Sequence, residues 1–146
     1  MIYLLPAARE AMRAQARAAY PRECCGALLG RTREGDGAAA REVVRSVPLA
    51  NAWMGAQERR YLIGSGTVLE LERQVEREGL ELIGFYHSHP DHAPIPSAFD
   101  REHAWPWYTY VIVAVRPELV GPVRAWRLAD DRSAFREEAV ATLEDP

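Results

Sequence analysis

The chain of 146 residues contains no lysine, because all 18 of its basic residues are arginine. Without a lysine amine, Schiff-base chemistry and a catalytic lysine are excluded. Cysteine is nearly absent as well, with only Cys24 and Cys25. Two adjacent cysteines are too few for a disulfide scaffold, and they lack the paired spacing of a zinc knuckle. We therefore expect a cytoplasmic protein.

Long apolar runs and a strong excess of one charge are also missing. No apolar run approaches the ~20 residues that span a bilayer, and the N-terminus lacks the pattern of a signal peptide. The net charge is only −3, which argues against nucleic acid as a partner because phosphate binding requires a basic face. Hydrophobic residues make up 48% of the chain, so a single domain over residues 1–146 is expected.

Helical and strand-like patterns alternate along the chain and predict one mixed α/β unit without a linker or an internal repeat. Gly79 is expected to end the second helix, and the β-branched run at 108–115 is expected to form a central strand. Helices are predicted at 7–20, from 64–67 to about 78, and at 97–104; strands at 25–30, 42–48, 59–63, 80–87, 108–115 and 123–128; a polar turn at 32–40; and either a strand or a helix at 133–143.

The segment 87–90 reads His-Ser-His-Pro and directly follows an apolar predicted strand. Residues i and i+2 of a strand point to the same face, so His87 and His89 can reach one ion. Asp100, in the first turn of the helix that Ser97 begins, can supply a third ligand. Three protein ligands leave one coordination position open, which is typical of catalytic rather than structural zinc.

A simpler interpretation exists for the same residues. Ser97 and Asp100 have the spacing of a helix-capping pair, in which the serine caps the helix and the aspartate complements its dipole. A pair of histidines at this spacing is also weak support for a metal site when it is considered alone. The order of the elements strengthens the metal interpretation: an apolar strand, the histidine pair, a proline-rich loop, and then the capped helix.

Other metal families also use a histidine pair. Residues 87–92 match the H-x-H-x-D-H pattern of metallo-β-lactamases, but no histidine follows His103 to supply their downstream ligands. Cupins place a glutamate where this chain has Pro94, and the H-x-E and P-C-x-x-C motifs of nucleobase deaminases are absent. Two histidines and a carboxylate also describe non-haem iron sites, although the usual order of ligands there is different.

Taken together, these residues resemble the JAMM/MPN+ family of zinc metallopeptidases, and most of all its compact bacterial branch. The family motif is H-x-H-P, six residues, then S-x-x-D, and residues 87–90 and 97–100 match it. A second family motif, P-x-E-x-C-G-x-L-x-G, is matched by residues 21–30. The resemblance implies an α+β domain with a mixed, curved sheet flanked by helices, related in architecture to cytidine deaminase-like folds.

The resemblance also implies a mechanism. His87, His89 and Asp100 would ligate one Zn²⁺ per chain, with water in the fourth position. Glu23 would act as general acid and base, and Ser97 would donate a hydrogen bond to the oxyanion. The implied reaction is hydrolysis of the amide or isopeptide bond after the C-terminal Gly-Gly of a ubiquitin-like or sulfur-carrier protein. The alternative is a non-catalytic scaffold of the same fold, against which the complete ligand set argues.

The residues around the predicted metal site can also be placed from the sequence. Residues 59–63 and 91–96 are expected to wall a groove for the Gly-Gly tail, because only glycine passes a narrow constriction. His92 is expected at the surface near that cleft, and His103 is expected to be exposed or packed. The nearby aromatic residues are expected to pack in the core and against the sheet; they are Trp105, Trp107, Tyr108 and Tyr110.

Overall fold

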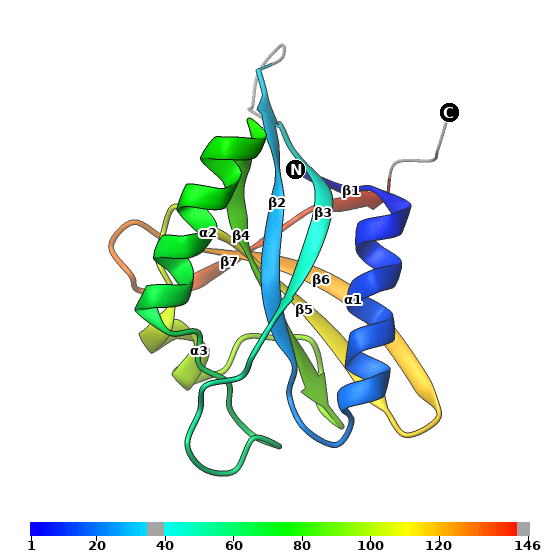
Figure 1. Ribbon diagram of the computed structural model, residues 1–146. Helices are drawn as coiled ribbons and strands as arrows, with labels where there is room; N and C mark the ends of the chain where they lie inside the picture. Colours follow the sequence, from blue (N-terminus) through cyan, green and yellow to red (C-terminus); the bar gives the residue numbers. More distant parts are fainter. Residues whose placement is uncertain (35–39, 143–146) are drawn as a thin grey trace.

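The computed structural model describes residues 1–34 and 40–142 (Figure 1). Its elements in chain order are β1 (Ile2–Leu4), α1 (Pro6–Ala19), β2 (Cys25–Arg33), β3 (Ala40–Leu49), α2 (Ser65–Glu78), β4 (Glu81–Pro90), α3 (Ala98–His103), β5 (Thr109–Arg116), β6 (Leu119–Leu128), β7 (Phe135–Glu138) and β8 (Val140–Thr142). No helix within these described ranges is both long and apolar enough to cross a membrane.

The strands form one eight-stranded sheet in the order β7-β6-β5-β4-β2-β3-β1-β8. β4 runs parallel to β5, and β1 runs parallel to both β3 and β8, whereas the other neighbours are antiparallel. The sheet is mixed and twisted, and helices lie on both of its faces (Figure 1). This architecture confirms the α+β fold with a curved sheet flanked by helices that the sequence predicts.

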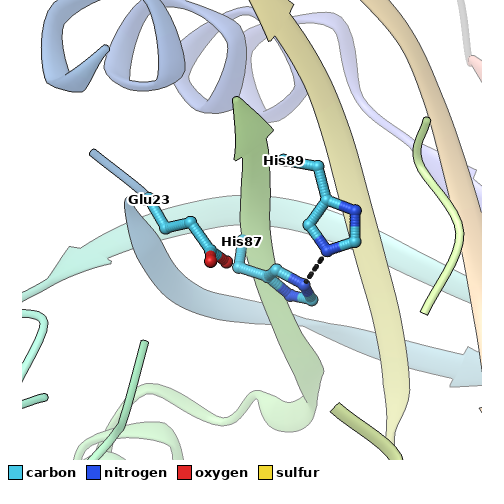
Figure 2. Close-up of side chains that lie close together, drawn as sticks. All are labelled: Glu23, His87 and His89. Atoms are coloured by element: carbon cyan, nitrogen blue, oxygen red, sulfur yellow. Dashed lines mark hydrogen bonds between the residues drawn. The ribbon is translucent and has the colours of Figure 1, made fainter. Parts of the chain in front are cut away.

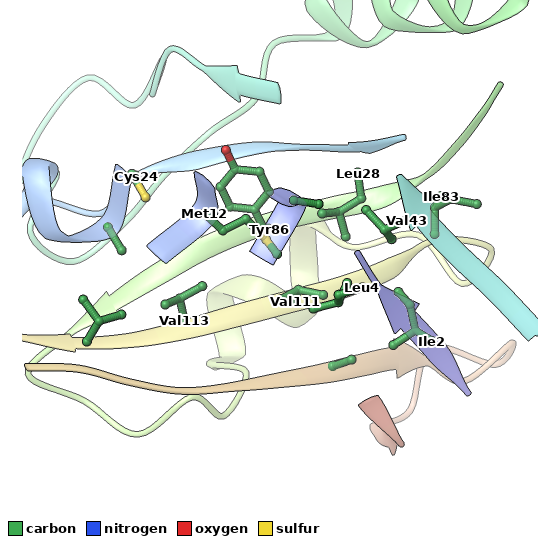
Figure 3. Packing of buried hydrophobic residues seen from close by; sticks show 14 of the residues in the cluster. Ile2, Leu4, Met12, Cys24, Leu28, Val43, Ile83, Tyr86, Val111 and Val113 are labelled. Carbon is green, nitrogen blue, oxygen red and sulfur yellow. The ribbon is translucent and has the colours of Figure 1, made fainter. Parts of the chain in front are cut away.

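Alternation along the strands separates two apolar clusters. Leu28 of β2 belongs to the cluster that receives α1, whereas the next residue, Leu29, belongs to the cluster that receives α2. Met12 of α1 packs in the first cluster together with strand residues of the sheet (Figure 3). Successive side chains of a strand point to opposite faces, so a single strand supplies both layers of the core.

The two long helices lie where the sequence predicts, although α1 begins and ends one residue earlier than expected. Pro6 occupies the first turn of α1, where a missing N–H costs nothing. Gly79 ends α2 with φ +68°, a left-handed conformation that glycine adopts without strain. Ser97 caps α3 in the predicted way, with its side chain accepting the Asp100 N–H.

β4 is the strand that carries the histidine pair, and it lies between β2 and β5 in the interior of the sheet. His87 is paired with Cys25 on β2 and with Ile112 on β5. Gly84 lets the two parallel strands approach closely, because a Cβ there would collide with the carbonyl of Thr109. The two histidines therefore belong to a strand whose two edges are both hydrogen-bonded to neighbouring strands.

The predicted strand at 59–63 is wrong, because this segment is irregular. Its backbone groups are paired locally instead of with the sheet. The side-chain oxygen of Asn51 accepts the N–H of Leu62 at 3.0 Å, and the Leu62 carbonyl accepts the N–H of Ala52 at 2.9 Å. The Asn51 side chain and the Ala52 backbone thus take the place of a neighbouring strand.

Other boundaries differ by smaller amounts. The strand Ile2–Leu4 was not predicted, and β6 begins at Leu119 rather than at 123. The predicted polar turn at 32–40 starts too early, since β2 continues to Arg33; residues 35–39 lie outside the described residues. The ambiguous segment 133–143 contains the two short strands β7 and β8, and its last residue lies outside the described residues.

Candidate metal centre

Three donor atoms converge where β4 meets α3. The Nε2 atoms of His87 and His89 lie 3.0 Å apart, and each lies 3.3 Å from Oδ2 of Asp100. Tetrahedral zinc with metal–ligand bonds of ~2.0–2.1 Å separates its ligand atoms by about 3.3–3.4 Å. The donor types and their spacing therefore fit a single zinc ion.

Hydrogen bonds fix two of these three side chains. Nδ1 of His89 bonds to the Ala93 carbonyl at 2.9 Å, which leaves its Nε2 lone pair for a metal. Asp100 Oδ2 accepts the N–H of Ser97 at 2.8 Å, and Ser97 Oγ accepts the N–H of Asp100 at 3.1 Å. The capping interpretation and the metal interpretation thus describe the same pair, because the cap orients the carboxylate toward the histidines.

Burial and charge set the protonation of the cluster. Burial lowers the pKa of His87, which favours the neutral imidazole that a metal requires. Burial alone would raise the pKa of Asp100, but the charge of His87 and hydrogen bonds from both histidines and Ser97 hold it well below the usual range. At neutral pH the cluster therefore contains the ionised carboxylate of Asp100 and at least one neutral imidazole, that of His87.

Glu23 lies beside the histidines (Figure 2), although 64 residues separate its neighbour Cys24 from Ser88. The link is the residue between the two histidines: Ser88 Oγ accepts the Cys24 N–H at 2.9 Å, and the Ser88 N–H bonds to the Cys24 carbonyl at 3.1 Å. The Glu23 N–H also donates to the Gln57 carbonyl at 2.7 Å. Strand pairing and the irregular segment together hold this glutamate in the site.

Glu23 is buried, with only 6% of the residue exposed. Burial raises its pKa to about 8, while the charge of His89 lowers it and that of Asp100 raises it. One donor atom each of Glu23, His87 and His89 also lie within 4.8 Å of one another, so distance alone would allow Glu23 as a ligand. Asp100, at 3.3 Å from both histidines, is the better-placed carboxylate for that role.

A cavity of about 700 Å³ opens onto this cluster. Its lining includes Glu23, His89, Ser97 and Asp100, so four of the five predicted site residues share it, and the fifth, His87, lies directly beneath. Residues of both predicted groove walls line the same cavity; they are Arg59 and Arg60 from 59–63, and His92, Ala93 and Ile95 from 91–96. His92 thus lies at the cleft, as expected.

The aromatic residues after α3 are only partly as predicted. Tyr108 and Tyr110 are buried, but Trp105 and Trp107 are 52% and 59% exposed, so the prediction that they pack in the core is wrong. The two indoles stack on each other at 5.3 Å. Trp105 borders an apolar cavity of about 470 Å³ that lies between α2 and the end of α3. His103 is exposed and packs on Phe99, as expected.

Sequence reasoning predicted the irregular segment after β3 as a groove wall but missed its side-chain contacts with α3 and with His87. Arg60 lies over the rings of Phe99, at 4.7 Å, and Trp53, at 5.6 Å, which attaches this segment to α3. Tyr61 stacks on His87. The sequence carries no local signal for the contacts with Phe99 and His87, because both residues are distant from this segment along the chain.

The chain belongs to the family of prokaryotic homologues of the JAB domain, whose model matches residues 5–129. This match confirms the resemblance drawn from the two motifs.

Relatives and solved structures agree with this family. The chain is 37% identical over 123 residues to desampylase of Haloferax volcanii, covering 83% of this chain and 78% of the relative. It is 33% identical over 138 residues to CysO-cysteine peptidase of Mycobacterium tuberculosis, covering 92% and 86%. The solution structure of a Desulfitobacterium hafniense protein matches with a TM-score of 0.83 at 31% identity, over 99% and 94% of the chains. A JAB1/MPN domain protein from Archaeoglobus fulgidus shares the fold, with a TM-score of 0.58 at 17% identity over 97% and 99%.

Proposed function

We propose that the protein is a zinc-dependent peptidase of the JAMM type, which hydrolyses the amide or isopeptide bond that joins a ubiquitin-like or sulfur-carrier protein to its conjugate. The observation that carries the proposal is the convergence of His87, His89 and Asp100 at 3.0–3.3 Å, with the Glu23 carboxyl group at the same cavity. The activities in the names of the two relatives, desampylase and CysO-cysteine peptidase, support this class of reaction.

His87, His89 and Asp100 would hold one zinc ion per chain. When bound, zinc supplies a Lewis acid that makes hydroxide available near neutral pH and polarises the scissile carbonyl. Glu23 would accept a proton from the attacking water and return it to the leaving amine. Burial raises the pKa of this carboxyl group to about 8 in the metal-free protein, and a cation bound beside it would favour the ionised form that a general base requires.

Ser97 is suited to stabilise the oxyanion. Its Oγ already accepts the Asp100 N–H at 3.1 Å, so its own hydroxyl hydrogen is available to donate into the cavity. Such a donor contributes about 10²–10³ to the rate when it is positioned in advance. The cap therefore gives Ser97 a fixed place from which to donate.

The cavity supports a narrow, extended substrate segment. Its lining includes residues 58–60 and His92, Ala93 and Ile95, together with the proposed ligands His89 and Asp100. A C-terminal Gly-Gly tail fits such a groove because glycine adds no side chain to clash with the walls. We therefore propose a carrier protein with a Gly-Gly tail as the substrate, with its scissile carbonyl between Glu23 and Ser97.

The test is a cleavage assay with Gly-Gly-extended sulfur-carrier proteins carrying either a C-terminal cysteine or a lysine-linked peptide. We expect about one zinc per chain, loss of cleavage with a chelator and recovery when zinc is restored. A chain that binds no zinc and whose thermal stability does not respond to zinc would be a scaffold instead. If iron(II) under anaerobic conditions restored cleavage and zinc did not, the catalytic metal would be iron.

The remaining expectations stay predictions. A cytoplasmic location, a single unit over residues 1–146 and the absence of nucleic-acid and membrane partners follow from composition alone. Cell fractionation and limited proteolysis of the whole chain would check the first two, and a nucleic-acid retention assay would check the third.

A further inference from the structure

Tyr61, in the irregular segment between β3 and α2, lies flat against a residue of the metal cluster. Its ring stacks on His87 with a centroid separation of 4.3 Å and an interplanar angle of 23°. His87 comes from the centre of the sheet, whereas Tyr61 comes from a segment without regular secondary structure. The contact joins the least regular part of the site to its most rigid part.

The two histidines are oriented by different contacts. A metal-ligating histidine usually donates the N–H of its second nitrogen to a carbonyl or carboxylate, which fixes the ring. His89 follows this rule through the Ala93 carbonyl at 2.9 Å. Nδ1 of His87 is buried and has no hydrogen-bond partner in the part of the chain that the structure describes. The plane of the His87 ring is therefore determined by packing.

Tyr61 is itself held on both sides along the chain. On one side, Arg60 lies over the rings of Phe99 and Trp53. On the other, the backbone of Leu62 is bonded to Asn51 and Ala52. Tyr61 also lines the apolar cavity of about 470 Å³, so its ring separates this cavity from His87.

We propose that Tyr61 is a positioning residue for the metal centre, whose ring fixes the plane of the His87 imidazole by stacking in place of the missing hydrogen bond. The inference rests on the proposed zinc site and deepens it. A ring held in this plane keeps Nε2 of His87 directed at the point that Nε2 of His89 and Oδ2 of Asp100 also face. Without the tyrosine ring, the imidazole can rotate into the apolar cavity and water can reach it.

The test measures zinc affinity by competition with a chromogenic chelator, and ligand geometry from the visible spectrum of the Co²⁺-loaded protein. We expect Tyr61→Phe, which keeps the ring, to match the wild type. Tyr61→Leu should raise the zinc Kd by about 10–100-fold, the usual effect of losing a residue that orients a ligand, and should alter the Co²⁺ spectrum. Tyr108→Leu is the matched control, because it removes a ring from the same cavity without touching a ligand.

The outcomes separate this inference from the proposed function. If the wild type binds zinc and Tyr61→Leu binds it equally well, the positioning role is overturned. The same holds if Tyr61→Phe weakens binding as much as Tyr61→Leu, since the hydroxyl rather than the ring would then be responsible. If the wild type itself binds neither zinc nor Co²⁺, the proposed function fails. Should Tyr61→Leu not fold by circular dichroism, Tyr61→Met replaces it with the same expectation.

Discussion

The two faces of the sheet are covered in different ways. On one face, the single helix α1 spans fourteen residues and inserts Ala8, Met12 and Ala16 into a continuous apolar cluster. On the other face, α2, the six-residue α3 and the irregular segment after β3 share the cover, and cavities of about 470 and 700 Å³ open among them. Both faces use the same strands.

The closed face of the sheet contributes mainly to the stability of the fold, whereas the open face can carry the chemistry. A face closed by one helix excludes water and stabilises the fold through burial. A face closed by several short pieces leaves openings, and the polar side chains of β4 that point toward it can meet a ligand. His87 and His89 point to the second face, whereas Tyr86, which lies between Phe85 and His87, packs in the first cluster.

The largest effect is expected on the open face. Glu23→Gln should lower the cleavage rate by about 10²–10⁴-fold, because an amide of the same shape cannot transfer protons. Zinc content should remain at about one per chain, as measured by metal analysis. Glu76→Gln is the matched control, since Glu76 is an exposed residue of α2 that does not line this cavity, and the cleavage rate of this variant should stay near that of the wild type.

Two results would change this assignment. Full activity of Glu23→Gln would remove Glu23 from the mechanism. Loss of zinc from the same variant would make Glu23 a ligand, which its distance from the two histidines also allows.

On the closed face, the expected effect is on stability alone. Leu28 is fully buried in the cluster that receives α1, so Leu28→Ala should reduce the free energy of unfolding by about 2–5 kcal/mol. The zinc Kd of the folded variant should stay unchanged, because the site lies on the other face.

The smallest effect is expected for an exposed residue. Trp107→Ala removes a side chain that is larger than leucine but exposed, so it should reduce the free energy of unfolding, measured in urea, by about 0.5 kcal/mol or less. For Leu28→Ala, by contrast, a rise in zinc Kd would show that packing on the closed face of the sheet affects metal binding on the open face.

A further effect on stability should appear in the pH dependence of the metal-free protein. Burial raises the pKa of Glu23 from 4.5 to about 8, so between these values the folded state binds more protons than the unfolded state. The contribution of Glu23 to stability is therefore present below about pH 4.5 and is lost as pH rises toward 8, by an amount on the order of a few kcal/mol. Thermal unfolding of the metal-free wild type and Glu23→Gln at pH 5 and pH 8 measures the difference. An equal pH dependence of the two proteins would contradict the raised pKa.

The sequence was most informative where the site is local. The spacing of His87 and His89 and the Ser97 cap of α3 both follow from short-range geometry, and the structure has them as predicted. The proximity of Glu23 could be inferred only from the family resemblance, because it depends on pairing between β2 and β4. The pattern at 59–63 suggested a strand, but the Asn51 side chain and the Ala52 backbone satisfy the backbone groups of Leu62 instead.

Exposure was the other property that the sequence did not reveal. The four aromatic residues after α3 have similar apolar character, yet Tyr108 and Tyr110 are buried while Trp105 and Trp107 are not. Tyr110 belongs to β5 and Tyr108 directly precedes it, whereas the tryptophans lie in the connection from α3. Their position relative to the sheet, rather than their residue type, decides their burial.

The hydrogen bonds between Ser88 and Cys24 also impose an order of assembly. His87, His89 and Asp100 lie within fourteen consecutive residues, so a short stretch of chain contains the complete ligand set. The Ser88–Cys24 bonds join residues 64 positions apart, and they form only when the N-terminal part of the chain pairs with β4. Closing such a long loop is slow compared with local contacts. We therefore expect the three ligands to come within reach of one another before the glutamate joins them, so that the part of the site that holds a metal assembles before the part that uses it.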